Sequence, residues 1–157
     1  MIESTQAYLI REGKWLFLLR NKKAHDVNHN KYIGVGGKRE ANETIRACIK
    51  REIKEETGYH ANELKYHGIL YFHYEKEESE KIWVYTCNEF TGEEIDCDEG
   101  SLVWVPEEDI LNLDLWEGDR IFLEKLLNHN EELFCYAFHY DQNGNLIKAE
   151  EKECEDE

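Results

Sequence analysis

The sequence predicts a mixed α/β fold, an α/β/α sandwich around a mixed β-sheet. Short runs rich in β-branched and aromatic residues lie on both sides of a central segment, residues 42–58, that has apolar residues at helical spacing. A second segment with helical spacing, residues 117–127, lies near the end of the chain. Strands that surround a helix, with a second helix to cover the other face, are typical of a sandwich of this class.

The first strands are predicted from apolar runs on either side of a turn. Residues 6–10 and 15–19 flank Glu12-Gly13 and are expected to form a hairpin. Residues 21–31 are polar and read as a loop, and residues 33–37 as a short strand that runs into Gly36 and Gly37.

The later strands follow the central helix. Residues 64–74 and 81–89 are expected to be strands joined by an acidic loop, and residues 102–105 a further strand closed by Pro106, the only proline. Residues 107–111 can start a short helix. A last hairpin, residues 133–140 and 146–148, surrounds Asn143-Gly144, a dipeptide that favours a type I′ turn.

The central helix contains acids where its apolar face should be. Asn42 is a candidate N-cap, and Gly58 suits the left-handed residue that ends a helix. Glu52 and Glu56 lie one turn apart inside the apolar stripe, with Glu55 at its border; the stripe itself consists of Ile45, Cys48, Ile49 and Ile53. Carboxylates that face a core are costly unless something neutralises them.

A hard divalent cation is one partner that can neutralise these acids. Carboxylates at positions i and i+4 converge, and Mg²⁺ or Mn²⁺ takes oxygen ligands. The carbonyl of Gly37, just before the helix, is a further candidate ligand because glycine lets the backbone approach closely. The alternative interpretation is an ordinary charged helix whose acids pair with Lys50 and Lys54, preceded by a tight glycine turn.

The spacing of residues 37–59 resembles the Nudix box: Gly37, five residues, Glu43, seven residues, then Arg51-Glu52-Ile53-Lys54-Glu55-Glu56 and Gly58. Tyr59 stands where an aliphatic residue is usual. The similarity extends from about residue 6 to about residue 146. It implies the same sandwich fold, a Mg²⁺ or Mn²⁺ cofactor, and hydrolysis of a nucleoside diphosphate linked to another group.

The resemblance also implies roles for individual residues. Glu99, in the acidic loop 96–100, corresponds to a loop that many Nudix hydrolases place beside the metal; the alternative is a solvated turn. Glu55, Glu56 and Glu99 are each candidates for the proton acceptor, and Arg51 is expected to pair with Glu43 as structural support. The implied catalytic set is Arg51, Glu52, Glu55, Glu56 and Glu99, and the implied metal ligands are Gly37, Glu52, Glu55, Glu56 and Glu99.

Residues 116–119, Trp-Glu-Gly-Asp, resemble the base site of Nudix enzymes that cleave oxidised purine nucleotides. The resemblance implies that Trp116 stacks on the base and that Asp119 hydrogen-bonds its edge. Gly118 and Ile33 depart from the animal enzymes, which have Asp and Asn there. Lys22 or Lys23 is expected near phosphate. Helix-entry packing for Trp116, a first-turn acid for Asp119 and solvated lysines are the alternatives.

Three functions are compatible with this reading. The first is a MutT-type pyrophosphohydrolase that converts 8-oxo-dGTP to the monophosphate and pyrophosphate, a role in nucleotide-pool sanitation and DNA repair. The second is hydrolysis of another nucleotide derivative, such as ADP-ribose or a dinucleoside polyphosphate. The third, a Nudix module that binds a nucleotide or partner without cleavage, is disfavoured because all the helix acids are present.

Composition bounds the remaining possibilities. The 157 residues predict one domain, residues 1–149, and an acidic, disordered tail, residues 150–157. A net charge of −16 argues against a nucleic-acid polymer as partner. Five unpaired cysteines, no signal peptide and no long apolar run predict a cytoplasmic protein that does not enter a membrane. The oligomeric state is not indicated.

Overall fold

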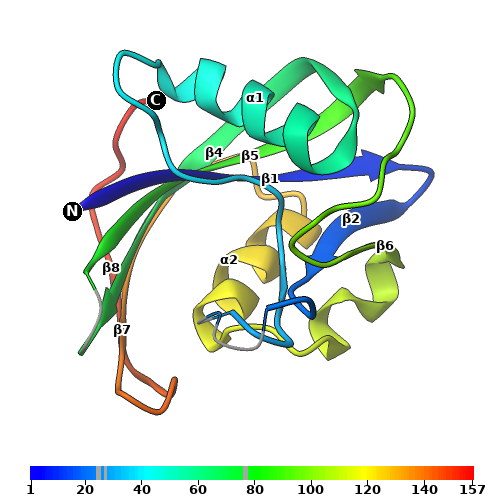
Figure 1. The fold of residues 1–157 in the computed structure, drawn as a ribbon. Helices are drawn as coiled ribbons and strands as arrows, with labels where there is room; N and C mark the ends of the chain where they lie inside the picture. Colours follow the sequence, from blue (N-terminus) through cyan, green and yellow to red (C-terminus); the bar gives the residue numbers. More distant parts are fainter. Residues whose placement is uncertain (24–25, 27, 76–77) are drawn as a thin grey trace.

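The computed structural model describes residues 1–23, 26, 28–75 and 78–157 (Figure 1). Its helices are α1 (Ile45–Thr57), the 3₁₀ helix η1 (Glu107–Asn112) and α2 (Glu117–Leu127). Its strands are β1 (Ile2–Arg11), β2 (Lys14–Leu19), β3 (Tyr32–Ile33), β4 (His60–Tyr74), β5 (Glu80–Thr91), β6 (Ser101–Pro106), β7 (Phe134–Tyr140) and β8 (Leu146–Glu151).

The strands form one mixed sheet in the order β3-β2-β1-β5-β4-β7-β8, with β6 added beside β2. The pairs β1·β5 and β4·β7 are parallel, and the other pairs are antiparallel. Helix α1 lies on one face of the sheet and α2 on the other (Figure 1). The predicted α/β/α sandwich around a mixed sheet is therefore confirmed.

Two apolar cores, one on each face, hold these layers together. Alternation along β1 directs Ala7 and Leu9 into the core under α1 and Tyr8 into the core under α2. Ile49 and Ile53 of the α1 stripe are fully buried, as the helical spacing predicted, and the core residues of α2 are Phe122, Leu123 and Leu126. The sheet is thus buried on both faces.

The first hairpin turn lies where the sequence predicted it, and the last one differs in its type. Glu12 and Gly13 both have positive φ, 53° and 74°, and join paired residues, so this turn is the type I′ one. At the predicted site, only Gly144 has positive φ, and its N–H donates to the Asp141 carbonyl. The type I′ prediction for Asn143-Gly144 is therefore wrong: Gly144 follows a turn that Asp141 opens.

Two predictions around the loop before α1 also need correction. The predicted strand 33–37 is regular only at Tyr32–Ile33, after which single bridges join Val35 to Ala7 and Lys38 to Ser4. Thr44 is the N-cap, because its side chain accepts from the Ala47 N–H. Asn42 instead has a positive φ of 66° and lies outside the helix. Gly58 ends α1 with φ 85°, as predicted.

The C-terminal residues cross the sheet face that carries α1. Strand β8 runs to Glu151, two residues past the predicted domain boundary. The Glu155 carboxylate accepts from Tyr71 and Lys81, at 2.5 and 3.1 Å, and Glu157 pairs with Arg46 at 2.6 Å. The division into a domain, residues 1–149, and a disordered tail, residues 150–157, stays a prediction. In the structure, Glu155 and Glu157 of this segment contact the domain.

All five cysteines are free thiols, four buried and Cys154 exposed. Within the described ranges, no helix is both long enough and apolar enough to span a bilayer.

Candidate active site

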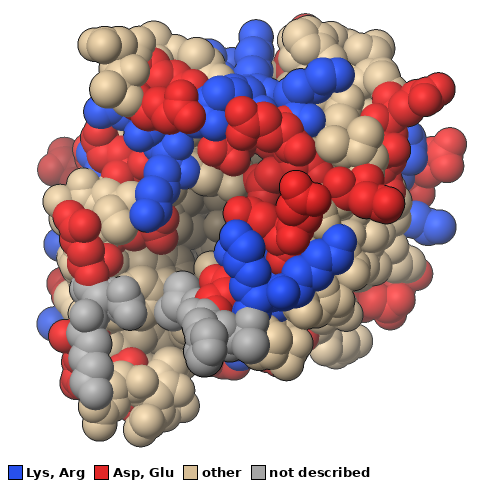
Figure 2. Space-filling view, viewed as in Figure 1, with Lys and Arg blue, Asp and Glu red and all other residues tan. Residues whose placement is uncertain are grey.

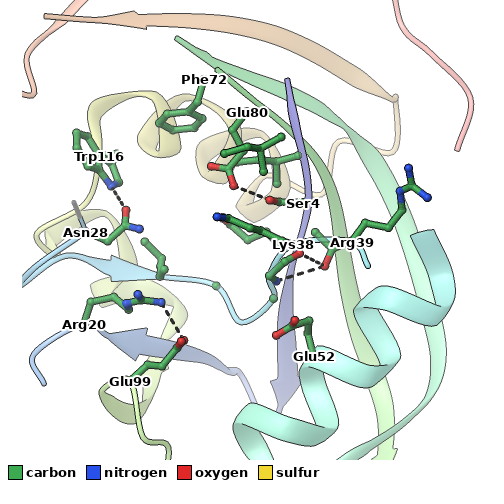
Figure 3. Close-up of a pocket in the computed structure, with 18 of the residues that line it drawn as sticks. Ser4, Arg20, Asn28, Lys38, Arg39, Glu52, Phe72, Glu80, Glu99 and Trp116 are labelled. Atoms are coloured by element: carbon green, nitrogen blue, oxygen red, sulfur yellow. Dashed lines mark hydrogen bonds and ion pairs between the residues drawn. The ribbon is translucent and has the colours of Figure 1, made fainter. Parts of the chain in front are cut away.

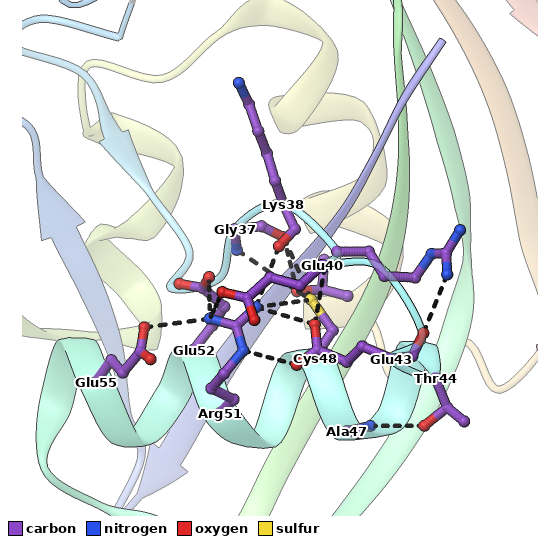
Figure 4. A network of polar contacts seen from close by, with 12 residues as sticks. Gly37, Lys38, Glu40, Glu43, Thr44, Ala47, Cys48, Arg51, Glu52 and Glu55 are labelled. Atoms are coloured by element: carbon purple, nitrogen blue, oxygen red, sulfur yellow. Dashed lines mark hydrogen bonds and ion pairs between the residues drawn. The ribbon is translucent and has the colours of Figure 1, made fainter.

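Arg51 organises the carboxylates of helix α1 (Figure 4). Its guanidinium contacts Glu43 at 2.6 and 3.0 Å, Glu52 at 2.8 Å and Glu55 at 3.2 Å. The hydrogen bond from Arg51 lowers the pKa of Glu43 to about 2, so Glu43 is a charged partner at neutral pH. The expected pairing of Arg51 with Glu43 is therefore present, and it fastens the loop before the helix to the helix itself.

Gly37 leaves space that the Glu52 carboxylate occupies. A Cβ on residue 37 would lie 2.6 Å from Glu52 Cδ, which is closer than any real contact. The Gly37 carbonyl accepts from the Thr5 N–H at 2.9 Å and from the Thr5 hydroxyl at 3.2 Å, so this loop is fixed to β1. Burial raises the pKa of Glu52, whose side chain reaches from α1 to this loop.

Glu56 is the most buried of the predicted ligands, at 6% exposure. Its Oε1 accepts from the Gly36 N–H at 2.7 Å, whereas Oε2 has no partner among the described residues. Burial, and then the negative charges of Glu99 and Glu52, raise the pKa of Glu56 to about 9. A buried carboxylate oxygen without a donor is a site where a cation would restore the missing interaction.

The donor set fits a hard divalent cation, although the side chains do not yet enclose one. No group of three or more His, Cys, Asp or Glu residues in the described part of the chain is gathered closely enough to hold a metal ion as it stands. Arg51 holds Glu52 and Glu55 in ion pairs, and Glu55 is exposed. The orphan oxygen of Glu56 and an oxygen-only donor set are nevertheless the features that Mg²⁺ or Mn²⁺ requires.

Glu99 extends from the loop before β6 toward the same region. Arg20 contacts it at 3.0 Å and also contacts Asp26 at 2.5 Å, while Lys23 is 3.8 Å from Glu99. Lys22 donates to the Cys97 carbonyl at 2.5 Å. The two predicted substrate-binding lysines thus hold the acidic loop, and neither lines the cavity described next.

One cavity of about 640 Å³ joins the carboxylates to the predicted base site. That volume lies within the range of small-molecule sites, about 300–1,000 Å³. Gly37, Glu52 and Glu99 line one end, and Trp116 and Asp119 line the other. Figure 2 shows the hollow in this face, with acidic and basic side chains gathered around it, and Figure 3 shows the side chains that point into it.

Trp116 is both a packing residue and a wall of this cavity. Its side chain is 6% exposed and makes edge contacts with Phe72, at 6.3 Å between ring centroids, and with Tyr140, at 5.0 Å. The indole N–H donates to Asn28 Oδ1 at 2.7 Å, which fixes the ring plane. Lys31 lies 5.5 Å from the ring centroid. Trp116 therefore packs at the start of α2 and also lines the cavity.

Asp119 is buried at the same end, at 2% exposure. Its Oδ1 has no hydrogen-bond partner among the described residues, and burial raises its pKa to about 8. A pKa of about 8 leaves the carboxyl group mostly protonated at pH 7. A neutral acid can donate one hydrogen bond and accept another, which a carboxylate cannot do.

This raised pKa predicts a pH-dependent stability. The folded-state pKa of about 8 lies above the unfolded value of 3.8, so the contribution of Asp119 to stability is lost as pH rises from about 4 to about 8. Replacing Asp119 by Asn removes this titration. We expect the free energy of unfolding of wild type, relative to Asp119→Asn, to fall by up to about 1.4 kcal/mol per pH unit in that window.

Urea unfolding of both proteins from pH 5 to pH 9, without divalent metal, measures this difference. All other titrating groups are shared and cancel. A difference that does not change with pH would mean that Asp119 is ionised in the folded protein.

The two departures from the animal base site have physical explanations. A Cβ at Gly118 would lie 2.6 Å from the Phe138 ring and 2.7 Å from the Tyr140 hydroxyl, so an Asp does not fit there. Ile33 supplies only an apolar wall. Asn28 lines the cavity nearby, and its Nδ2 has no partner among residues that the structure describes.

Sequence reasoning missed several polar cavity residues, namely Ser4, Gln6, Arg20, Asn28, Lys38 and Glu80. Lys38 follows the box glycine, and Figure 4 shows its side chain extending away from the α1 carboxylates. Its position directly after Gly37 could have identified it as a cation near the phosphates. The others come from separate strands and loops, and no local spacing connects them.

Fold and box together define a Nudix-type domain. Residues 3–126 match the NUDIX domain family, and the chain belongs to this family of hydrolases that act on phosphoanhydride bonds. It is 29% identical over 121 residues to the uncharacterized Nudix hydrolase YvcI of Bacillus subtilis. The matched residues cover 74% of this chain and 76% of that protein.

Two further proteins are similar to this chain. The oxidized purine nucleoside triphosphate hydrolase of Danio rerio is 24% identical over 135 residues, or 85% of each chain. The crystal structure of the MutT protein from Bacillus halodurans superimposes with a TM-score of 0.86 at 24% identity, over 97% of this chain and 98% of that one. The fold is therefore that of MutT proteins.

Proposed function

We propose that this protein is a Mg²⁺- or Mn²⁺-dependent nucleoside triphosphate pyrophosphohydrolase that acts on oxidised purine nucleotides, with 8-oxo-dGTP as a substrate and the monophosphate and pyrophosphate as products. The observation that carries the proposal is one cavity with Glu52 and Glu99 at one end and Trp116 and the buried Asp119, whose pKa burial raises, at the other. The triphosphate would lie at the carboxylate end, with the metal, and the purine base at the end with Trp116 and Asp119. The two ends of the cavity thus match the two ends of a nucleotide.

A neutral Asp119 suits an oxidised purine better than an ordinary one. Its carboxyl group pairs with a base edge on which a carbonyl lies beside an N–H, by donating to the first and accepting from the second. Oxidation of guanine at C8 places a hydrogen on N7, beside O6, and so creates an additional edge of this kind that dGTP lacks. Asn28 Nδ2 is a further donor at this end of the cavity.

At the phosphate end, the side chains would align the substrate and hold the metal. When bound, a divalent cation supplies charge that stabilises the phosphates and acidifies the attacking water. Glu52, Glu56 and Glu99 would hold it, with Glu55 and the Gly37 carbonyl as further ligands. Lys38 lines the cavity and would contact the phosphates in place of Lys22 or Lys23, which face the acidic loop.

Glu99 is the best-placed proton acceptor of the three candidates. It lines the cavity, whereas Glu55 and Glu56 do not. Arg20 holds one of its oxygens at 3.0 Å, which orients the carboxylate and leaves the other oxygen close to the exposed Lys23. Hydrolysis requires alignment of water with the phosphorus more than covalent help from the protein, and a fixed carboxylate meets that need.

A substrate panel tests the proposal. Phosphate and pyrophosphate release is measured with Mg²⁺ on 8-oxo-dGTP, dGTP, the other dNTPs, ADP-ribose and diadenosine polyphosphates. We expect kcat/KM for 8-oxo-dGTP to exceed that for dGTP by at least about tenfold, because one additional hydrogen bond to a buried group has about that effect. Pyrophosphate, not phosphate, is the expected second product.

The other outcomes are equally informative. A preference for ADP-ribose or a dinucleotide keeps the metal site and rejects the base site. No hydrolysis of any compound, with nucleotide binding intact, rejects the enzyme and supports a binding module.

A further inference from the structure

Glu80 is a cavity residue that the proposed function leaves without a role. It begins strand β5, and its carboxylate Oε2 accepts from the Ser4 hydroxyl at 2.5 Å (Figure 3). Ser4 is 3% exposed and lies on β1, so its hydroxyl is a fixed donor. Both residues line the same cavity as Glu52, Glu99 and Trp116.

The strand pairings place Glu80 between the two ends of the cavity. On one side its partner in β4 is Phe72, whose ring contacts Trp116 at the base end. On the other side, Glu80 accepts a hydrogen bond from Ser4, and the backbone of Ser4 forms an isolated β-bridge with Lys38. Lys38 follows Gly37 at the phosphate end of the cavity. The part of a nucleotide that lies between its base and its phosphates is the sugar.

The chemistry of Glu80 also points to a ligand with hydroxyl groups. The side chain is only partly exposed, and among the described residues it has no cation partner and a single hydrogen-bond donor, Ser4. A carboxylate has about four acceptor positions, so most of its capacity remains for a ligand. Phosphates would be repelled by this negative charge, whereas sugar hydroxyls would donate to it.

We propose that Glu80, oriented by Ser4, accepts hydrogen bonds from the 2′-hydroxyl of the nucleotide and makes ribonucleotides the preferred substrates. The inference rests on the proposed function, since it assumes that a purine nucleoside triphosphate occupies the cavity. Acceptance of the 2′-hydroxyl by a carboxylate is the way dinucleotide-binding folds read ribose. 8-oxo-dGTP remains a substrate, and 8-oxo-GTP is a better one.

The test is the ratio of kcat/KM for 8-oxo-GTP to that for 8-oxo-dGTP in four proteins. Wild type should prefer the ribonucleotide by about tenfold or more, the effect of one charge-assisted hydrogen bond. In Glu80→Gln the ratio should fall to near 1. In Ser4→Ala, which keeps the charge but removes the fixed donor, it should take an intermediate value. Glu89→Gln makes the same charge change at the exposed far end of β5 and should keep the wild-type ratio.

A binding measurement without metal separates recognition from turnover. The ratio of the Kd values for GMP and dGMP should favour GMP in wild type and Glu89→Gln, and should be lost in Glu80→Gln. Circular dichroism and thermal unfolding confirm that each variant is folded.

The outcomes distinguish the two proposals. If neither 8-oxopurine triphosphate is hydrolysed, the proposed function fails. If both are hydrolysed but wild type shows no ribose preference, or Glu80→Gln keeps it, the assignment of Glu80 is overturned while the proposed function stands.

Discussion

Glu56→Gln is expected to lower kcat/KM by at least about a thousandfold while the fold persists. The loss corresponds to about 4 kcal/mol of transition-state stabilisation. Glutamine keeps the shape of the side chain and its acceptor for the Gly36 N–H, but it replaces the oxygen without a partner, which would be anionic when a cation is bound, by an amide nitrogen. A neutral amide cannot serve as a charged ligand for a divalent cation.

The same substitution should leave the metal-free protein as stable as wild type, or more so. Glu56 has a pKa of about 9 in the fold, so it is already neutral at pH 7 without metal. Wild type should gain stability when Mg²⁺ is added, and Glu56→Gln should gain less. Glu89→Gln controls for the loss of one negative charge. Wild-type turnover by Glu56→Gln at saturating Mg²⁺ would remove Glu56 from the metal site.

Trp116→Ala is expected to raise KM for a purine triphosphate by about 5- to 150-fold. Stacking of a base on an aromatic side chain is worth about 1–3 kcal/mol, and each 1.4 kcal/mol is about tenfold in affinity. The substitution should also destabilise the fold by about 3–5 kcal/mol, because Trp116 is buried among Phe72, Tyr74 and Tyr140.

Two variants separate these effects. Leu123→Ala removes a fully buried side chain from the same core but not from the cavity wall, so it should lower stability and leave KM unchanged. Trp116→Phe keeps an aromatic face and loses the N–H bond to Asn28, so KM should rise only a few-fold. If KM rises equally in Leu123→Ala, Trp116 has only a packing role.

The Nudix box was predictable because its geometry is local. Residues one turn apart on a single helix must lie together, and Arg51 therefore contacts Glu55 without any help from the rest of the fold; Glu52 is its neighbour in the sequence. The helix start was less certain, because Asn42 and Thr44 are both good caps. Only the backbone, with Asn42 at positive φ, decides for Thr44.

The middle of the cavity could not be predicted in this way. Ser4 meets Glu80 through the register of a parallel strand pair, and sequence patterns do not give a register. The sequence favoured Lys22 and Lys23, whereas the cavity contains Arg20. All three follow the last residue of β2, where no helix or strand spacing fixes the direction of a side chain. A prediction of substrate contacts needs the sheet topology first.

The parallel pairing of β1 with β5 has a further consequence for how the protein folds. It joins Ile2 to Glu80 and Leu9 to Cys87, so the chain must close a long loop before these two strands gain contacts with each other. Folds dominated by such distant pairings fold slowly. During synthesis, β1 has only its hairpin partner β2 until β5 has left the ribosome. The cavity, which Ser4 of β1 and Glu80 of β5 both line, is therefore complete only after this long-range pairing has formed.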